Sequence, residues 1–336
     1  MTKVKWGILS TANIAQEALL PAFTRSTNAE VIAIASNNVQ KAKGIADRFQ
    51  INKVYDSYEK LLEDPDIQAV YIPLPNHLHK EWVMRAAEKG KHILCEKPAG
   101  LDYTEVKEML TACRAMNVLF MEAFMYQFHP QHQRVKDIIA SGEIGEVTLM
   151  NSAFSYFLTN KEENIRMSQE KGGGSLYDVG CYPIHAICNI FGEEPEEVFA
   201  QAIIDETYKV DTDVVAQLTF PSGKMAKLDA SFRLTFRNEY EVIGSKGKMM
   251  ISNAFRPDVE GGDGLVKVET EDGIREEVIN GDIYRGEIEH FSEAIQMQKE
   301  VHQLQQTPEQ TINTAKIIDA CFESMKTGHK VRLDTI

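Results

Sequence analysis

Near its start the chain reads Val4-Lys5-Trp6-Gly7-Ile8-Leu9-Ser10-Thr11-Ala12-Asn13-Ile14-Ala15, an apolar run, a short turn and the beginning of a helical pattern. We predict a strand for the apolar run and a helix over Ile14–Phe23. A turn from strand to helix presents backbone N–H groups and the positive end of the helix dipole to an anion. The three glycine positions of the usual dinucleotide fingerprint fall on Ser10, Ala12 and Ala15. The turn therefore leaves two interpretations open, a pyrophosphate site or an ordinary turn of small residues. In the first, the contacting residues are Ser10, Thr11, Ala12, Asn13 and Ile14.

Strands and helices alternate from this turn to about residue 121, which predicts βαβ units and a parallel sheet with helices on both faces. We therefore expect a doubly wound Rossmann domain over residues 1–121. The expected strands are Val4–Leu9, Glu30–Ala35, Ala69–Leu74, His92–Cys95 and Val118–Met121, and the expected helices are Ile14–Phe23, Lys41–Phe49, Lys80–Lys89 and Tyr103–Met116.

The pattern changes in the remainder of the chain, residues 122–336. Successive apolar runs are separated by short polar turns such as Pro221-Ser222-Gly223, which is typical of an antiparallel sheet. We expect a second, α+β domain with a large, mostly antiparallel open sheet. Two helices should close the chain, near Arg285–Gln298 and Pro308–Lys326, with Thr307 capping the second.

Composition excludes several classes of protein. A chain of 336 residues is long enough for two domains. Lys and Arg total 36 against 50 Asp and Glu, for a net charge of -14, so nucleic-acid binding is not expected. No segment approaches the roughly 20 apolar residues that cross a bilayer. The five cysteines are scattered and lack a Cys-x-x-Cys pair, which indicates free thiols and a cytoplasmic protein.

The end of the second predicted strand reads Ala35-Ser36-Asn37-Asn38. An acid at this point would bind the adenosine ribose and repel a 2′-phosphate, and none is present. Ser36 and Asn37 can donate hydrogen bonds to a phosphate, with charge from Lys41 or Lys43. We therefore favour NADP over NAD, with an ordinary β-turn as the alternative.

A loop with two prolines and two histidines follows the strand that ends at Leu74. The spacing of His77 and His79 resembles that of a pair of metal ligands. No acidic residue or cysteine lies at the spacing needed to complete a metal site, so we expect no metal. The carboxyl ends of parallel strands are where α/β sheets bind ligands. We therefore expect this loop to line the cofactor site, through Pro73, Leu74, Pro75, Asn76 and His79.

Two further motifs carry candidate chemistry. Cys95-Glu96-Lys97-Pro98 follows an apolar strand directly, so Glu96 and Lys97 should lie at the same cofactor-facing edge, unless Lys97 is an ordinary surface charge. The run Gly172-Gly173-Gly174 precedes a helical pattern in which Asp178, Tyr182 and His185 recur on one face. The alternative for this face is a helix cap followed by a buried polar stripe.

These motifs together resemble the Gfo/Idh/MocA family of oxidoreductases along essentially the whole chain. Its Glu-Lys-Pro strand end, Pro-Leu-Pro-Asn-His loop and Gly-Gly-Gly-x-Leu-x-Asp-x-Gly-x-Tyr block all match in order. The chain is most similar to the branch with dimeric dihydrodiol dehydrogenase and NADP-linked D-xylose dehydrogenase. The resemblance implies that the last helix packs back on the first domain and that the chain forms a homodimer or homotetramer.

The resemblance also implies roles for individual residues. Lys97 corresponds to the active-site lysine, Asp178 to the acid of the motif, and Tyr182 to the proton donor or acceptor. Arg166 is similar to an arginine that approaches the cofactor. His185 stands where relatives vary, so it either faces the substrate or packs. Asn37 replaces an arginine common in NADP-using relatives, which leaves NAD open.

Together these features predict an NAD(P)-dependent oxidoreductase that transfers a hydride between the nicotinamide and a CH–OH carbon of a sugar, polyol or cyclic diol. Tyr182 would exchange the hydroxyl proton, with the cation of Lys97 favouring its phenolate. Two alternatives are a transhydrogenating sugar oxidoreductase with tightly held NADP and a non-catalytic NAD(P)-binding sensor. An intact Lys97, Asp178 and Tyr182 argues against the sensor.

Overall fold

The computed structural model describes residues 2–336, which divide into two compact units. The first contains the chain up to Met125 together with Tyr284–Ile312, and the second contains Tyr126–Ile283 and Asn313–Ile336. The sequence predicts a boundary near residue 121 and assigns the helix near Arg285–Gln298 to the second domain. In the structure, the segment Tyr284–Ile312 clusters with the first unit. In the described part of the chain, no helix is long and apolar enough to cross a membrane.

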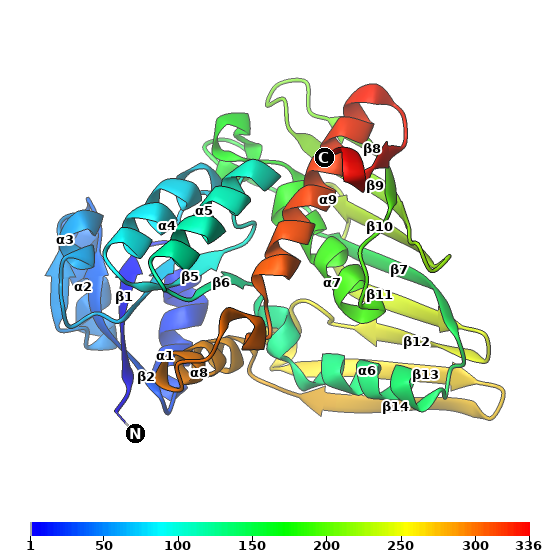
Figure 1. Ribbon diagram of the computed structural model, residues 1–336, viewed down its shortest axis with the longest axis horizontal. Coiled ribbons are helices and arrows are strands. Elements are labelled where there is room, and N and C mark those ends of the chain that lie inside the picture. Colours follow the sequence, from blue (N-terminus) through cyan, green and yellow to red (C-terminus); the bar gives the residue numbers. More distant parts are fainter. Residues whose placement is uncertain (1) are drawn as a thin grey trace. The chain divides into compact units, whose positions relative to one another are not determined.

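The first unit is built on a six-stranded sheet with the order β3-β2-β1-β4-β5-β6 (Figure 1). Every pair in this sheet is parallel. This is the doubly wound order. Successive strands are added on one side of β1 up to β3 and then on its other side from β4 onward, and ligands bind in the crevice at the carboxyl ends of the strands where this order reverses. The strands are β1 Val4–Leu9, β2 Ala29–Ala35, β3 Lys53–Tyr55, β4 Ala69–Ile72, β5 His92–Glu96 and β6 Phe120–Ala123.

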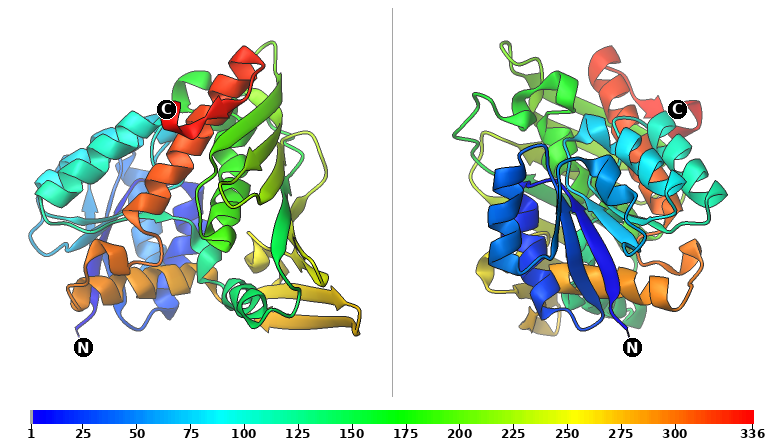
Figure 2. Two further views of the ribbon diagram at one scale, coloured as in Figure 1. Left: turned by 45° about the vertical axis from the view of Figure 1, so that its right-hand side comes forward. Right: turned by 90° about the vertical axis from the view of Figure 1, so that its left-hand side faces the viewer.

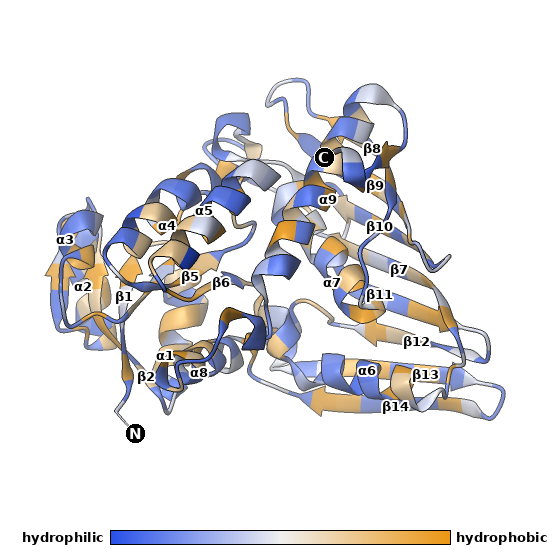
Figure 3. Ribbon diagram, viewed as in Figure 1, coloured by the Kyte–Doolittle hydropathy of each residue, from blue (hydrophilic) through white to orange (hydrophobic). Residues whose placement is uncertain are grey.

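Helices cover both faces of this sheet, and their polar caps mark where each begins. Asn38, Ser57 and Asp102 each accept a hydrogen bond from a backbone N–H in the first turn of the following helix. Figure 3 shows the strands mainly in hydrophobic colours and the helices striped, as expected for a buried sheet under amphipathic helices. The helices are α1 Leu20–Arg25, α2 Val39–Phe49, α3 Tyr58–Leu62, α4 His79–Glu88, α5 Tyr103–Ala115 and α8 Ile283–Gln296.

Helix α8 joins the first unit through the core beside β1. Trp6 is fully buried, and its ring packs against Phe23 and Phe291 with centroids 5.3 and 5.7 Å away. Its indole N–H donates to Ser292 Oγ at 3.1 Å. A buried tryptophan needs such a partner for its donor, so α8 completes the core that the first 125 residues begin.

The second unit contains a nine-stranded sheet with the order β14-β13-β12-β11-β7-β10-β9-β8-β15. Only β7 and β10 pair in parallel; the other neighbours are antiparallel, as predicted. The strands are β7 Val147–Ser155, β8 Glu197–Ile204, β9 Asp211–Thr219, β10 Met225–Ser231, β11 Arg237–Gly244, β12 Gly247–Ser252, β13 Asp263–Thr270, β14 Gly273–Asn280 and β15 Val331–Arg332.

One face of this sheet is covered by helices α6 Pro130–Ser141 and α7 Cys181–Phe191 and by the later part of α9 Pro308–Thr327 (Figures 1 and 2). The other face carries no helix of this unit. The alternating burial of β10, in which Ala226, Leu228 and Ala230 are buried, reflects these two environments. The fold class predicted from the sequence, a Rossmann domain with an α+β domain, is confirmed.

Candidate active site

The first turn of the six-stranded sheet lies between β1 and a π-helix over Ala15–Leu19. Ser10 has a φ of 136°, a backbone conformation that favours glycine. Two hydrogen bonds hold it there: the Ala12 N–H donates to Ser10 Oγ at 3.1 Å, and Ser10 Oγ donates to the Pro73 carbonyl at 3.3 Å. A serine thus supplies the backbone that a glycine usually provides. The turn fits a dinucleotide pyrophosphate, because the first N–H groups of a helix are available to an anion.

The turn after β2 contains no carboxylate. Ser36 is buried, and its hydroxyl accepts a hydrogen bond from the Asn38 N–H at 3.1 Å. Asn38 in turn accepts from the Lys41 N–H at 3.0 Å and caps α2. Asn37 and Lys41 are exposed. The arrangement leaves an amide and an ammonium group near the position where an adenosine ribose binds in this fold.

His79 joins the two loops that follow β4 and β5. It is fully buried, with Nε2 2.8 Å from the Leu74 carbonyl and Nδ1 2.9 Å from the Pro98 carbonyl. Burial lowers the pKa of His79 to about 4. The sequence placed His79 among the cofactor contacts, whereas the structure places it beneath the loops that should make those contacts. Its role there is to hold Pro73–Asn76 beside Lys97–Ala99.

The Glu96-Lys97 pair stands at the end of β5, as expected from the sequence. Glu96 accepts a short hydrogen bond, 2.5 Å, from the Tyr71 hydroxyl of the neighbouring strand β4. Burial and the Glu96 carboxylate raise the pKa of Tyr71 well above its ordinary value. Lys97 is partly exposed and is followed by a cis peptide bond to Pro98.

In the second unit, Asp178 is the centre of a polar cluster. Its Oδ2 accepts from the Nε of Arg166 at 2.8 Å and from the Tyr156 hydroxyl at 2.7 Å. The carboxylate raises the pKa of the Arg166 guanidinium, while burial raises that of Tyr156. The structure therefore brings together the predicted Arg166 and Asp178 and adds Tyr156, which follows β7 directly. The cluster fixes the Arg166 guanidinium against the Asp178 carboxyl group.

Asp178 and Tyr182 belong to a helix that changes type between them. Leu176–Gly180 is a π-helix, and α7 begins at Cys181. Segments of π-helix are uncommon and occur frequently at functional sites. Tyr182 is 5% exposed, and its ring packs against those of Phe154 and Phe255 with centroids 5.2 and 5.6 Å away.

His185 lies deeper in the same helix. It is 1% exposed, and its Nδ1 is 2.5 Å from the hydroxyl oxygen of Tyr126. Tyr126 also packs on the ring of Tyr182, with centroids 6.0 Å apart. The open alternative from the sequence, a buried polar stripe on this helix, accounts for these contacts, and a catalytic role for His185 stays a prediction.

The glycine run Gly172–Gly174 before this helix is needed for close contacts within the protein. The Gly174 N–H donates to the Arg166 carbonyl at 2.9 Å, and a Cβ on Gly173 would lie 2.5 Å from that carbonyl oxygen. The chain segment that carries Arg166 therefore needs glycine here in order to reach Asp178. The Asp211 carboxylate of β9 accepts from the Leu176 N–H at 2.7 Å and from the Ser175 hydroxyl at 2.8 Å.

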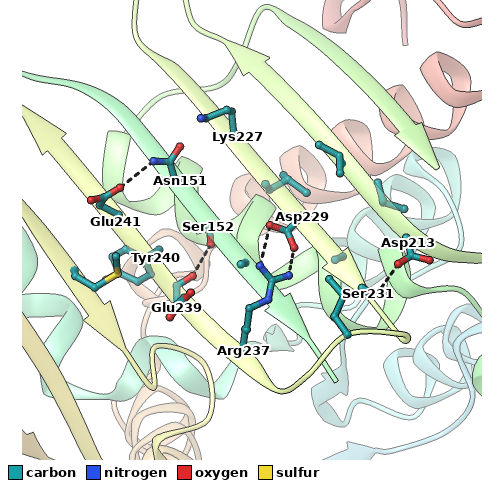
Figure 4. Close-up of a pocket in the computed structure, with 17 residues that line it drawn as sticks. Asn151, Ser152, Asp213, Lys227, Asp229, Ser231, Arg237, Glu239, Tyr240 and Glu241 are labelled. Carbon is teal, nitrogen blue, oxygen red and sulfur yellow. Dashed lines mark hydrogen bonds and ion pairs between the residues drawn. The ribbon is translucent and has the colours of Figure 1, made fainter. Parts of the chain in front are cut away.

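A hollow of about 600 Å³ lies on the bare face of the nine-stranded sheet (Figure 4). Its walls carry paired charges, including the Arg237–Asp229 ion pair and an Asn151–Glu241 hydrogen bond of 3.0 Å. None of the predicted catalytic residues lines it. Because the predicted catalytic residues lie elsewhere, we do not assign the active site to this hollow.

Sequence reasoning missed three residues that hold the predicted site in place: Tyr156, Asp211 and Glu122. The Glu122 carboxylate accepts the Ala99 N–H at 2.9 Å, beside Lys97. One signal was available for Glu122, since it is an acid within the apolar run Leu119-Phe120-Met121-Glu122-Ala123. The other two lie in or after strands far along the chain from their partners, and no sequence spacing links them.

The Rossmann sheet, the Lys97 loop and the Asp178 cluster are typical of a dinucleotide-binding oxidoreductase with two structural units. Residues 4–124 match the oxidoreductase family with a NAD-binding Rossmann fold, and residues 132–250 match the GFO/IDH/MocA C-terminal domain. The chain therefore belongs to the Gfo/Idh/MocA family of oxidoreductases. The predicted family and the predicted enzyme class, an NAD(P)-dependent oxidoreductase, are confirmed.

Relatives with recorded activities are similar over most of the chain. A D-xylose 1-dehydrogenase (NADP(+)) of Haloferax volcanii is 36% identical over 98% of this chain and 99% of the relative. A trans-1,2-dihydrobenzene-1,2-diol dehydrogenase of Xenopus tropicalis is 32% identical over 74% of each chain. Among solved structures, a 3-ketoreductase from Actinomadura kijaniata in complex with NADP and TDP-benzene is 32% identical, with a TM-score of 0.90 over 96% of this chain and 98% of that one.

Proposed function

We propose that this protein is an NADP-dependent dehydrogenase or reductase that acts on a CH–OH carbon of a sugar, polyol or cyclic diol. The observation that carries the proposal is the Asp178 cluster, in which Arg166 and Tyr156 hold a carboxylate one helical turn before Tyr182. Such a fixed charge beside a candidate proton donor has a use in catalysis and little use in a protein that only binds nucleotide.

The choice of NADP rests on two supports. The turn Ser36–Asn38 lacks the carboxylate that would repel a 2′-phosphate. The xylose dehydrogenase relative is named for NADP, and the ketoreductase structure contains it. The substrate class rests on the relatives, which are named for a sugar, a sugar nucleotide and a cyclic diol.

When bound, the cofactor supplies a nicotinamide that accepts or donates the hydride. The residues of this chain bind the cofactor and handle the proton. The turn Ser10–Ile14 holds the pyrophosphate, and the loop Pro73–Asn76 lines the ring. Tyr182 takes the proton from the substrate hydroxyl during oxidation and returns it during reduction. Lys97 donates a hydrogen bond to the reacting oxygen and stabilises its negative charge.

A parallel with the Actinomadura ketoreductase supports the pair Lys97 and Tyr182. Its solved structures include variants in which a lysine is replaced by alanine or glutamate and one in which a tyrosine is replaced by phenylalanine. In that protein, a lysine and a tyrosine were thus singled out for substitution. These are the two residue types on which our proposal depends.

The test is a screen of aldoses, polyols and trans-dihydrodiols with NADP⁺ and NAD⁺, followed by the absorbance of the reduced nicotinamide. We expect turnover with at least one substrate and faster turnover with NADP⁺. Protein that purifies with reduced cofactor and reduces a second sugar without added nucleotide would instead be a transhydrogenating enzyme. Nucleotide binding with no turnover over the whole panel would contradict the proposal in favour of a sensor.

We also infer that the chain forms a homodimer or homotetramer in the cytoplasm. The support is a set of exposed apolar side chains in the second unit, as expected at a contact between copies: Val215 is 61% exposed, Met225 46% and Leu234 44%. None of the five cysteines, all of which the structure describes, forms a disulfide, which suits a reducing compartment. Light scattering of the wild type and of Val215→Glu tests the assembly, and a wild type of monomer mass would exclude it.

A further inference from the structure

Glu122 is a carboxylic acid in the middle of a buried strand. It is 1% exposed, and its neighbour across the sheet is Cys95 of β5. Burying a carboxyl group costs several kcal/mol unless hydrogen bonds or a counter-charge compensate it. The partners of Glu122 therefore indicate why an acid stands in this strand.

Its hydrogen-bond donors come from two different parts of the chain. On one side, Oε1 accepts from the Ala99 N–H at 2.9 Å, two residues after Lys97. On the other side, Oε2 faces the Gln306 amide at 3.5 Å, and the Thr311 hydroxyl also donates to the carboxylate. Gln306 and Thr311 are themselves joined at 3.3 Å. The carboxylate thus links the Lys97 loop to the start of α9.

These partners lie next to the places where the chain leaves the first unit. One crossing is at Met125/Tyr126, just after Glu122, and another is at Ile312/Asn313, just after Thr311. The Lys97 loop is therefore tied, through one side chain, to two of the connecting segments.

Glu122 also interacts electrostatically with Lys97. The ammonium of Lys97 acts electrostatically on Glu122 and opposes the effect of burial, which raises the pKa of Glu122 to about 8. The other ionisable group beside it is the thiol of Cys95, whose pKa burial raises well above its ordinary value, so it carries no charge. On the α9 side, Gln306 and Thr311 are uncharged. Lys97 is thus the cation that the Glu122 carboxylate compensates once it is ionised, above about pH 8.

We propose that Glu122 is a positioning residue for Lys97: it holds the Lys97–Ala99 loop against the connecting segments and supplies a buried counter-charge for the lysine. This inference rests on the proposed role of Lys97 at the reacting oxygen. A merely structural acid would support folding and leave the chemistry of the Lys97 amine unchanged.

Glu122→Gln separates charge from shape, because the amide oxygen can still accept the Ala99 N–H. The matched control is Glu105→Gln, since the Glu105 carboxylate also holds this loop, accepting the Leu101 N–H at 3.0 Å, but is partly exposed. One measurement is the rate at which acetic anhydride labels Lys97 at a series of pH values, read by mass spectrometry with exposed Lys41 as the internal reference. It needs no turnover. The other is kcat and KM as functions of pH.

Above about pH 8, where the Glu122 carboxyl of the wild type is ionised, acetic anhydride should label Lys97 faster in Glu122→Gln than in the wild type, because the ammonium has lost a counter-charge. We expect kcat to fall roughly 10-fold or more, the effect of a misplaced catalytic group, with KM for NADP little changed. Glu105→Gln should match the wild type in both measurements. Thr311→Val, which removes one donor to the carboxylate, should move Lys97 labelling in the same direction by less.

Unchanged Lys97 labelling in both Glu122→Gln and Thr311→Val overturns the inference, whatever happens to activity. Thr311→Val also serves if Glu122→Gln does not fold. The proposed function fails separately: full activity in Lys97→Met would remove the lysine from the reaction, while normal labelling shifts in the Glu122 variant would still show the electrostatic link.

Discussion

Gly174 packs directly against the carboxylate of Asp211, so closely that a Cβ on Gly174 would overlap Asp211 Oδ1. The same carboxylate accepts hydrogen bonds from the Leu176 N–H and the Ser175 hydroxyl, and it therefore caps the helix that carries Asp178 and Tyr182. A residue from β9 thus fixes the start of a helix more than thirty residues earlier in the chain. The glycine is required so that the two can meet.

Gly174→Ala should disturb both the backbone and this cap. Its φ of 118° disfavours a side chain, and the new methyl group must displace Asp211. We expect a loss of roughly 2–4 kcal/mol in the free energy of unfolding, from strain and overpacking together. Gly273→Ala is the control, since Gly273 has a φ of 136° and nothing within 4 Å of its Cβ position. Equal losses in the two variants, measured by urea unfolding, would show that the contact with Asp211 contributes nothing.

Much of the fold could be predicted because its signals are local. The helices at Tyr103–Ala115 and Pro308–Thr327 have caps and apolar faces within their own sequence, and both lie within about one residue of their expected ends. The hairpin of β13 and β14 was missed. The outer strand β14 alternates exposed and half-buried residues with no buried face, so it lacks the apolar pattern that marks a strand.

The site was predictable only where a motif carries it. Lys97, Asp178 and Tyr182 are candidates because recognisable motifs contain them, and their catalytic roles stay predictions. Glu122 and Asp211 act through contacts with segments 23 and 35 residues or more away in the chain, which a motif cannot report. The motif of His79 predicts a cofactor contact, and the structure adds that both of its ring nitrogens lie at hydrogen-bond distance from backbone carbonyls.

Cofactor preference should respond to the residue at the end of β2. Ser36→Asp places a carboxylate beside the expected 2′-phosphate and should weaken NADP binding roughly 10-fold or more, while NAD binding changes little. Ser36→Ala removes the hydroxyl without adding charge and serves as the control. Titration of tryptophan fluorescence with each nucleotide gives both affinities. Tighter binding of NAD than of NADP to the unmodified protein would contradict the NADP assignment.

Activity should not depend on a metal ion. In the described residues 2–336, no group of three His, Cys, Asp or Glu side chains could hold one. The candidate ligands His79 and His185 instead contact backbone carbonyls and the Tyr126 hydroxyl. We expect full activity after dialysis against EDTA, assayed in metal-free buffer. Activity lost on dialysis and recovered with zinc would require a metal site that includes one of these histidines.

Stability should fall as the pH is lowered, in part through His132. This residue is buried, with Nδ1 2.8 Å from the Tyr240 hydroxyl and Nε2 2.9 Å from the Ala254 carbonyl, a set of partners that suits the neutral ring. Burial lowers its pKa from 6.5 to about 3. Between these values the unfolded chain binds a proton that the folded protein does not, so each such histidine costs about 1.4 kcal/mol per pH unit as the pH falls.

The measurement is the free energy of unfolding between pH 7 and pH 4 for the wild type and His132→Gln. The variant should be less stable at pH 7, where it has lost the histidine's contacts, and its stability should decline less steeply below pH 6.5. His329→Gln, at an exposed histidine, is the control and should keep the wild-type slope. A slope in His132→Gln equal to that of the wild type would show that His132 titrates normally in the folded protein.

Tyr182 and Lys97 should behave as one catalytic unit. Tyr182→Phe removes a single oxygen from a residue packed by Phe154 and Phe255, so folding and NADP binding should persist. The value of kcat/KM should fall by roughly 10²–10⁴, the usual contribution of a positioned acid or base. Lys97→Met should be at least as damaging, because it removes the donor that we propose for the reacting oxygen.

The double variant distinguishes this unit from two independent contacts. If the two residues move one proton together, Tyr182→Phe with Lys97→Met should be little worse than the worse single variant, because residues that act as one unit are not additive. Independent contributions would instead multiply. Melting curves recorded beside the kinetics separate chemistry from folding, since a structural role predicts that melting temperature and activity fall together. Near-normal turnover in Tyr182→Phe would transfer the proton role to Lys97 or His185 and leave Tyr182 as a substrate contact.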